Sequence, residues 1–349
     1  MKKVLSIVLA LALLCVTFAA CAGNGTSSTS SASEESSAVS SESSAEASES
    51  SASSEESAST EKTKIGILAP AVTHGWVAGV AYYAEQRCKE LSDTVDYKLY
   101  TSNNAEEMTS QIDDLKSWGA EAIVAFPQWE GMEVPIQNAI DSGITVVNFD
   151  IVIDADGVYR VTGDNEGMGV ESAKYIVEKI GTTGTVVALP VPTSGSVSEL
   201  RMKGFTDTMA EIAPDVEIIE YATAFTREDG LKDMADILTA NPQIDAVYSL
   251  DDETSIGALQ AIEDAGRTDI KAITGGGGCQ EYFRMIADEQ YADLGLCSAL
   301  YSPSMVEDAI KTGIDLLNGG EAEPIVVIPT TIVSADNVAD YLDPENTVY

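Results

Sequence analysis

The sequence predicts an α/β protein with two doubly wound lobes, each built on a parallel sheet. Three observations predict this class. Short runs rich in β-branched residues alternate with stretches of helical length between Lys62 and Tyr349. The strand candidates outnumber those that one doubly wound domain usually holds. The region is also long enough, and rich enough in Val, Ile, Leu and Ala, for two hydrophobic cores.

The strand candidates are apolar, β-branched and separated by turn residues or helical patterns. They are Lys64–Leu68, Tyr97–Thr101, Ala122–Phe126, Thr145–Phe149, Thr185–Leu189, Glu217–Tyr221, Ala246–Leu250, Lys271–Thr274 and Leu294–Ser298. Ligands of open parallel sheets bind beyond the carboxyl ends of the strands. We therefore expect binding residues directly after these runs.

The helix candidates lie between the strand candidates. They are Trp76–Leu91, Ala105–Trp118, Met168–Ile180, Ser198–Ile212, Glu228–Ala240, Thr254–Ala265 and Ser304–Leu317. Asn103 or Asn104 supplies an N-cap for the second of them, and Gly119 follows its last residue. Gly143, Gly181 and Gly266 are expected to end later helices. Helices between parallel strands cover both faces of each sheet.

The first residues have the pattern of an export signal. Lys2 and Lys3 precede an apolar run that ends at Leu14, which is shorter than the roughly 20 residues a membrane span needs. Small residues then lead to Cys21, an arrangement that resembles a bacterial lipoprotein cleavage site, although Phe18 stands where most such sites have Leu. We expect residues 1–20 to be removed, Cys21 to carry lipid, and the protein to lie on the extracytoplasmic face of the membrane. Ordinary secretion is the alternative.

Residues 21–61 are predicted to form a disordered tether. The segment is almost entirely Ser, Ala, Thr and Glu, with Val39 as its one branched aliphatic residue. Such a composition cannot bury enough apolar surface to offset the entropy of ordering. A flexible chain of this length spans roughly 35 Å, which holds a folded region near a membrane without fixing it. A tail that serves solubility alone is the other interpretation.

Charge and cysteine content exclude some partners. The formal net charge of −38 argues against nucleic acid. Of the five cysteines, Cys15 leaves with the signal and Cys21 takes the lipid, so Cys88, Cys279 and Cys297 remain. Their spacing indicates neither a disulfide framework nor a zinc site, and we expect no metal and no cofactor.

Five motifs of the folded region resemble one family in order and spacing. They are Lys64–Leu68 with Pro70 and Trp76, Gly143–Asp150, Gly163–Gly169, Arg201–Phe205, and Leu250–Leu259. In this set the sequence is similar to the type I substrate-binding proteins of ABC sugar transporters, in the ribose- and galactose-binding branch. The resemblance implies two lobes joined by a three-crossing hinge, with crossings near Val161, Tyr301 and Ile328. It implies an N-terminal lobe of residues 62–161 and 302–328 and a C-terminal lobe of residues 162–301 and 329–349.

The resemblance also implies a ligand site between the lobes. The residues that it places there are Thr73, His74, Trp76, Phe126, Asp150, Arg201, Phe225, Asp251 and Tyr301. Aromatic side chains would take the apolar face of a sugar, and Asp150 and Arg201 would bind its hydroxyl groups from opposite lobes. His74, the one histidine, could instead be an ordinary loop residue, and Trp129 could lie at the rim or on the surface.

Several positions depart from the family pattern. Ile151 stands where many relatives carry arginine, Phe126 where they carry asparagine, and Tyr301 where they carry glutamine. The family's Asn-Asp pair is Asp251-Asp252, and a run of glycines from Gly275 to Gly278 replaces its usual turn. The run lacks the features of a phosphate-binding loop and is expected to be a tight turn. A modified sugar, a polyol, a nucleoside-like ligand or a signalling molecule therefore fits about as well as a simple pyranose.

An enzyme is disfavoured by the same residues. Only the Asp251-Asp252 pair and the isolated His74 offer catalytic groups, and no nucleophile motif is present. A repressor of similar fold is excluded by the acidic tether at the place where its DNA-binding helices would lie. We expect a monomeric ABC solute-binding lipoprotein that delivers its ligand to permease subunits. A binding protein that presents its ligand to a membrane receptor is the alternative.

Overall fold

The computed structural model describes residues 61–72 and 75–349. The expected signal, the lipid-bearing Cys21, the tether up to residue 60, and the two predicted ligand residues Thr73 and His74 lie outside the described residues. No helix within the described ranges is both long and apolar enough to cross a membrane.

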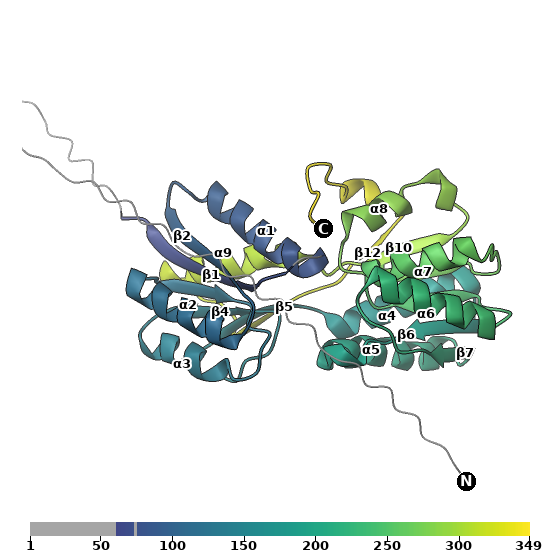
Figure 1. Ribbon diagram of the computed structural model, residues 1–349, viewed down its shortest axis with the longest axis horizontal. Helices are drawn as coiled ribbons and strands as arrows, with labels where there is room; N and C mark the ends of the chain where they lie inside the picture. The colour runs from purple at the N-terminus through teal and green to yellow at the C-terminus, as the bar shows by residue number, and fades with distance from the viewer. Residues whose placement is uncertain (1–60, 73–74) are drawn as a thin grey trace, which may run out of the picture. The chain divides into compact units, whose positions relative to one another are not determined.

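The described part of the chain forms two six-stranded sheets (Figure 1). The first has the order β11-β5-β4-β3-β1-β2 and is parallel throughout. Its strands are β1 (Thr63–Pro70), β2 (Val95–Ser102), β3 (Ala122–Ala125), β4 (Thr145–Phe149), β5 (Tyr159–Gly163) and β11 (Ile325–Ile328). We call this sheet and its helices the first lobe.

Helices cover both faces of the first sheet. They are α1 (Gly75–Glu90), α2 (Ala105–Trp118), α3 (Glu133–Asp141) and α9 (Val306–Leu317), the last preceded by the 3₁₀ turn η3 (Pro303–Met305). Ile67 and Val147 pack with α1 and α9, whereas Ile123 and Val146 pack with α2 and α3. Because successive strand residues point to opposite faces, both faces must be apolar, which explains the continuous apolar runs in the sequence.

The second sheet has the order β12-β10-β9-β8-β6-β7. Its strands are β6 (Thr183–Leu189), β7 (Asp215–Glu220), β8 (Ala246–Ser249), β9 (Ala272–Gly276), β10 (Gly295–Ala299) and β12 (Ile332–Ser334). Only the β10–β12 pair is antiparallel. We call this sheet and its helices the second lobe.

Helices also cover both faces of the second sheet. They are α4 (Asn165–Ile180), α5 (Ser196–Ile212), α6 (Arg227–Ala240), α7 (Asp252–Asp264) and α8 (Gln280–Ile286), with 3₁₀ turns η1 (Pro192–Ser194), η2 (Glu289–Tyr291) and η4 (Val338–Asp340). The helices α4 and α5 pack on one face, and α6, α7 and α8 on the other. The expected doubly wound architecture of two parallel-sheet lobes is thereby confirmed.

The chain passes between the two sheets three times. The first passage, at Asp164, joins β5 to α4, so Val161 lies inside β5 and the passage comes slightly later than expected. The second, Leu300–Ser302, joins β10 to η3, and the third, residues 329–331, joins β11 to β12. The last two lie side by side, because the Leu300 N–H donates to the Thr331 carbonyl at 2.9 Å.

The expected strands and helices are present, with small shifts at their ends, and five further elements were not predicted. These are β5, β11, β12, α3 and α8. Strand β12 has three residues, too few for a recognisable run, whereas β11 is a short apolar run at the edge of its sheet that the prediction missed. The N-cap is Asn104, whose side chain accepts from the Glu107 N–H at 2.9 Å.

Candidate ligand-binding cleft

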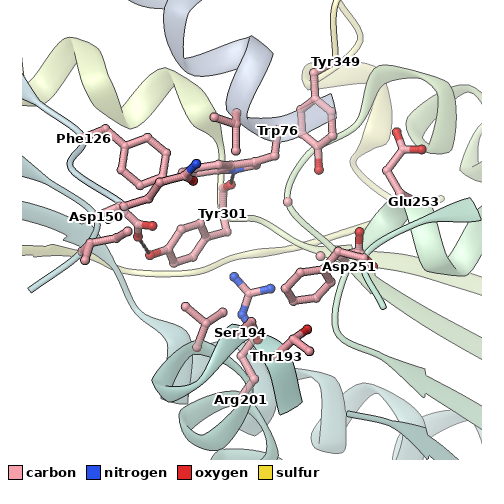
Figure 2. Close-up of a pocket in the computed structure, with 17 residues that line it drawn as sticks. Trp76, Phe126, Asp150, Thr193, Ser194, Arg201, Asp251, Glu253, Tyr301 and Tyr349 are labelled. Carbon is pink, nitrogen blue, oxygen red and sulfur yellow. Dashed lines mark hydrogen bonds between the residues drawn. The ribbon is translucent and has the colours of Figure 1, made fainter. Parts of the chain in front are cut away.

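A cavity of about 380 Å³ lies between the two lobes (Figure 2). Its walls come from loops at the carboxyl ends of strands in both sheets, from the start of α5, and from the second interlobe passage. The lining residues are Trp76, Val77, Phe126, Gln128, Asp150, Ile151, Thr193, Ser194, Val197, Arg201, Phe225, Asp251, Glu253, Gly276, Gly277, Tyr301 and Tyr349. The position is the one where parallel α/β sheets bind their ligands.

Trp76 is the centre of an aromatic group on the first-lobe side of the cavity. Its ring stacks on Phe149 with centroids 6.0 Å apart and meets Phe126 edge-on at 5.9 Å. The indole N–H donates to the Tyr301 carbonyl at 2.5 Å. The ring is therefore fixed from three sides, and the aromatic group offers a preformed apolar surface to a ligand.

Asp150 follows β4 and is held in an unusual backbone conformation, with φ of +65°. Its carbonyl oxygen accepts two hydrogen bonds from the Arg160 guanidinium, at 2.9 Å to Nε and 2.5 Å to Nη2. Its carboxylate accepts a hydrogen bond from the Tyr301 hydroxyl. Burial raises the pKa of Asp150, while that hydrogen bond and the nearby Arg201 oppose the rise. A carboxylate fixed in this way is placed to accept hydrogen bonds from a ligand.

Tyr301 joins this carboxylate to the hinge. Its ring packs directly on the backbone of Gly163, where a Cβ atom would lie 2.3 Å from the tyrosine Cε2. Its hydroxyl lies 3.2 Å from Thr162 Oγ1 and accepts from Asn165 Nδ2 at 3.3 Å. Tyr301 is part of the second passage, whereas these three partners flank the first. Any change in the hinge would therefore move the groups that surround Asp150.

Arg201 lies on α5 in the second lobe and is 7 % exposed. Nε donates to Asn165 Oδ1 at 2.9 Å, and Nη1 donates to the Leu250 carbonyl at 2.7 Å. The guanidinium carbon lies 5.0 Å from the centroid of the Tyr301 ring and 6.0 Å from that of Phe225. Figure 2 shows the Arg201 guanidinium near the Tyr301 ring, directed into the cavity. Among the described residues, Nη2 makes no hydrogen bond and can serve a ligand.

Two neighbouring carboxyl groups have different surroundings at the start of α7. Asp251 lines the cavity and caps the helix by accepting from the Thr254 N–H at 3.2 Å. Burial raises the pKa of Asp251 to about 7. Asp252 does not line the cavity, and its Oδ2 accepts from the Gly278 and Cys279 N–H groups, both at 2.8 Å.

Asp252 is fully buried, and burial raises its pKa to about 6. Its Oδ2 also accepts from Ser298 Oγ at 2.9 Å, while Oδ1 has no partner among the described residues. The carboxyl group thus holds the glycine turn after β9, where Gly277 and Gly278 have φ of +126° and +113°. The backbone of Gly276 and Gly277 lines the cavity, in line with the expected tight turn.

Seven of the predicted ligand residues line this one cavity: Trp76, Phe126, Asp150, Arg201, Phe225, Asp251 and Tyr301. Asp150 and Arg201 come from different lobes. Trp129 is half-buried against the hydrophobic core beneath α2 and α3 and is not among the lining residues.

Other lining residues were missed by sequence reasoning. Thr193 and Ser194 lie in the turn before α5, where a run of polar residues after β6 was a usable signal. Tyr349 carries no local signal, because only the folded chain brings it to the cavity. Within residues 61–72 and 75–349, no group of three or more acidic, histidine or cysteine side chains could hold a metal ion. Cys88, Cys279 and Cys297 are free and buried.

The chain is similar to a known protein family and to individual sugar- and polyol-binding proteins. Residues 65–321 match the family described as periplasmic binding protein domain. A xylitol-binding protein of Mycolicibacterium smegmatis is 27 % identical over 244 residues, which are 68 % of this chain and 68 % of that protein. The D-allose-binding periplasmic protein of Escherichia coli is 27 % identical over 250 residues, 66 % of this chain and 78 % of that protein.

The fold also matches solved structures. One is an ABC transporter periplasmic solute-binding protein from Actinobacillus succinogenes with bound D-allose. It has a TM-score of 0.72 and 22 % sequence identity, and the match covers 80 % of this chain and all of that one. The expected type I architecture is therefore confirmed, and the relatives are binding proteins rather than enzymes.

Proposed function

Because the chain belongs to the periplasmic binding protein family, we propose that it captures a sugar or polyol outside the cytoplasm and delivers it to the permease of an ABC importer. The relatives support this ligand class, because they are named for the binding of xylitol, allose and ribose. The protein acts as a monomer that is tethered to the membrane through lipid on Cys21. It releases its ligand when the lobes separate.

The observation that carries the proposal is the pairing of aromatic and charged groups across one cavity. A sugar or polyol has apolar C–H surface and hydroxyl groups around its edge. Trp76 and Phe126 offer aromatic surface, and Asp150 and Arg201 offer an acceptor and a donor from opposite lobes. Hydrogen bonds to charged groups are stronger in a closed cleft from which water is excluded.

The cleft offers a ligand more apolar surface than the family resemblance implies. At three lining positions where the resemblance implies an arginine, an asparagine and a glutamine, this chain has Ile151, Phe126 and Tyr301. The substitutions replace hydrogen-bonding groups with apolar or aromatic surface. We therefore include deoxy sugars beside pentoses, hexoses and polyols as candidate ligands.

A thermal-shift screen tests the ligand class. The panel contains ribose, allose, xylitol, myo-inositol, a deoxy sugar and adenosine. Ligand at about 100 times its dissociation constant adds roughly 2.7 kcal/mol to the free energy of unfolding, which raises the melting temperature by about 5–10 °C. Stabilisation by a sugar or polyol supports the proposal. Stabilisation by adenosine alone, or by none of these compounds, contradicts the proposed ligand class.

Replacement of Cys21 tests the anchor. In the full-length protein, Cys21→Ala should move the protein from the detergent-soluble membrane fraction into the medium or into an uncleaved precursor. Cys15→Ala is the matched control, because Cys15 lies in the segment expected to be removed. Membrane partitioning and electrophoretic mobility of the Cys21→Ala protein that both equal those of the control would rule out lipid at this position.

A further inference from the structure

The segment that follows β12 is fastened to the second lobe through α8. Gln280 Nε2 donates to the Tyr341 carbonyl at 3.0 Å, and Gln280 Oε1 accepts from the Asp343 N–H at 2.7 Å. The Tyr341 ring meets Phe283 edge-on, with centroids 6.1 Å apart. One side chain of α8 thus holds the backbone of this segment at two points.

The same segment then reaches the first lobe. Asn346 Nδ2 donates to the Tyr83 hydroxyl on α1 at 2.7 Å, and Asn346 is 1 % exposed. Asn346 Oδ1 accepts from the backbone N–H groups of Val348 and Tyr349 at 3.0 and 3.3 Å. One amide side chain therefore fixes both the docking on α1 and the turn that directs Tyr349. In Figure 1 this yellow end of the chain lies between α1 and α8.

Tyr349 is enclosed by glycines from both lobes and is 6 % exposed. A Cβ atom on Gly75 would lie 3.7 Å from its ring, and one on Gly79 would lie 3.3 Å from its Cβ atom. A Cβ atom on Gly277 would lie 2.1 Å from its hydroxyl oxygen. A side chain at Gly79 or Gly277 would crowd the tyrosine, so these glycines leave the space that it fills.

Tyr349 lines both the cleft and a second cavity. That cavity measures about 310 Å³ and has mainly polar walls, which include Arg227, Gln280 and Arg284. Among the residues that the structure describes, Glu253 and Tyr349 alone line both cavities. The Glu253 carboxylate is paired with the Arg227 guanidinium, so the tyrosine ring is the part of the shared wall that carries no charge.

We propose that Tyr349 is a specificity-determining residue whose ring ends the cleft and limits the ligand to a single sugar ring or a short polyol. This inference rests on the proposed function. The cleft volume of about 380 Å³ lies near the lower end of the roughly 300–1,000 Å³ found for ligand pockets. Without the ring, the polar second cavity would continue the cleft and could accept the hydroxyl groups of a second sugar unit.

The test compares Tyr349→Ala with Tyr349→Phe by calorimetry. The probes are the monosaccharide or polyol that the parent binds and the disaccharides cellobiose, trehalose and sucrose. We expect the parent and Tyr349→Phe to exclude the disaccharides by at least roughly 10- to 200-fold, the range in which a pocket wall discriminates against even small additions. Tyr349→Ala should gain at least one disaccharide within about tenfold of the monosaccharide. Tyr221→Ala, an exposed tyrosine outside both cavities, is the matched control.

A second, more conservative variant keeps the proposal testable if Tyr349→Ala does not fold. Tyr83→Phe removes the acceptor of Asn346 and leaves the cavity lining unchanged. Loss of one neutral hydrogen bond changes an equilibrium constant by about 2- to 12-fold. The affinity of Tyr83→Phe for disaccharides should therefore rise by about 2- to 12-fold relative to the parent. Equal exclusion of disaccharides by the parent, a folded Tyr349→Ala protein and Tyr83→Phe would overturn the proposal.

A readout without sugar separates this inference from the proposed function. Cys279 lines the second cavity and is 3 % exposed, whereas Cys88 and Cys297 are fully buried. Iodoacetamide should alkylate Cys279 faster in Tyr349→Ala than in Tyr349→Phe, with Cys88 and Cys297 unchanged. If no sugar or polyol of the screening panel binds the parent, the proposed function fails. The rate at which iodoacetamide alkylates Cys279 then decides alone whether the Tyr349 ring closes the cleft toward the second cavity. Equal rates in Tyr349→Ala and Tyr349→Phe would show that it does not.

Discussion

Replacing Asp150 by asparagine should weaken ligand binding without loss of stability. The perturbation removes only the charge, because asparagine is similar in shape and tolerates the left-handed backbone at φ of +65°. The new side-chain amide oxygen could still accept a hydrogen bond from Tyr301, and the backbone carbonyl at this position keeps the two bonds from Arg160. Asp150→Ala would be a poorer test, since it combines the lost carboxylate with backbone strain.

The size of the effect follows from the bond that changes. A hydrogen bond to a charged group contributes about 1.5–3 kcal/mol, and a neutral one about 0.5–1.5 kcal/mol. Each ligand hydroxyl that donates to the carboxylate therefore loses about 1–1.5 kcal/mol, and the dissociation constant rises by roughly 5- to 12-fold. Burial raises the pKa of Asp150, which means that the folded protein disfavours the charge. The free energy of unfolding at neutral pH should then stay the same or increase.

Titration calorimetry with the sugar or polyol found by screening measures the first effect, and urea unfolding without ligand measures the second. Asp154→Asn, at an exposed residue outside the cavity lining, is the matched control. An affinity within a factor of about two of the parent would refute the role of the charge in binding. A loss of stability greater than about 1 kcal/mol would refute the view that Asp150 serves the ligand at the expense of the fold.

Three further predictions concern packing, pH and closure. Gly204→Ala should destabilise the protein by about 1–3 kcal/mol, because its Cβ atom would lie 2.0 Å from the Glu166 carbonyl oxygen; unchanged urea unfolding would contradict this. The pKa of Asp251 is raised to about 7 in the folded protein, so between about pH 4 and 7 this carboxyl group is protonated more in the folded than in the unfolded state. Its contribution to the free energy of unfolding is therefore lost as pH rises from about 4 to about 7. Asp251→Asn should therefore gain stability relative to the parent from pH 5 to pH 8, and a constant difference in urea unfolding would argue against it. Ligand should reduce the radius of gyration in small-angle scattering; a tight ligand that leaves an open apo form unchanged would disprove hinge closure.

The sequence was sufficient to predict the strands in which both faces are buried. Val146 and Val147 show why, because neighbouring residues pack into opposite hydrophobic cores and the run must be apolar throughout. Strand β11 was not predicted, although its four residues are all apolar and β-branched and the run was a usable signal. In the structure the strand lies at the sheet edge, where Ile325 and Val327 are more than half exposed.

The candidate site was predictable only where a residue ends a strand or lies in a recognisable motif. Asp150 directly follows β4, and its position beyond the strand end could be expected from the sequence. Tyr349 could not, because its neighbours Gly75 and Gly277 are far away along the chain. The hydrogen bonds of Arg201 to Asn165 and Leu250 also depend on tertiary packing, although the arginine itself belongs to a motif.

The three passages between the sheets have a consequence for how the chain can fold. Helix α9 and strand β11 belong to the first lobe but follow β10 of the second in the sequence. Ala309 and Ile310 on α9 are fully buried, so a chain that has emerged only as far as β10 still lacks part of its first hydrophobic core. Closing that core joins residues far apart in sequence, which slows folding. Neither lobe is therefore a contiguous stretch of chain that could be expressed alone, and a truncation before α9 damages the lobe that was synthesised first.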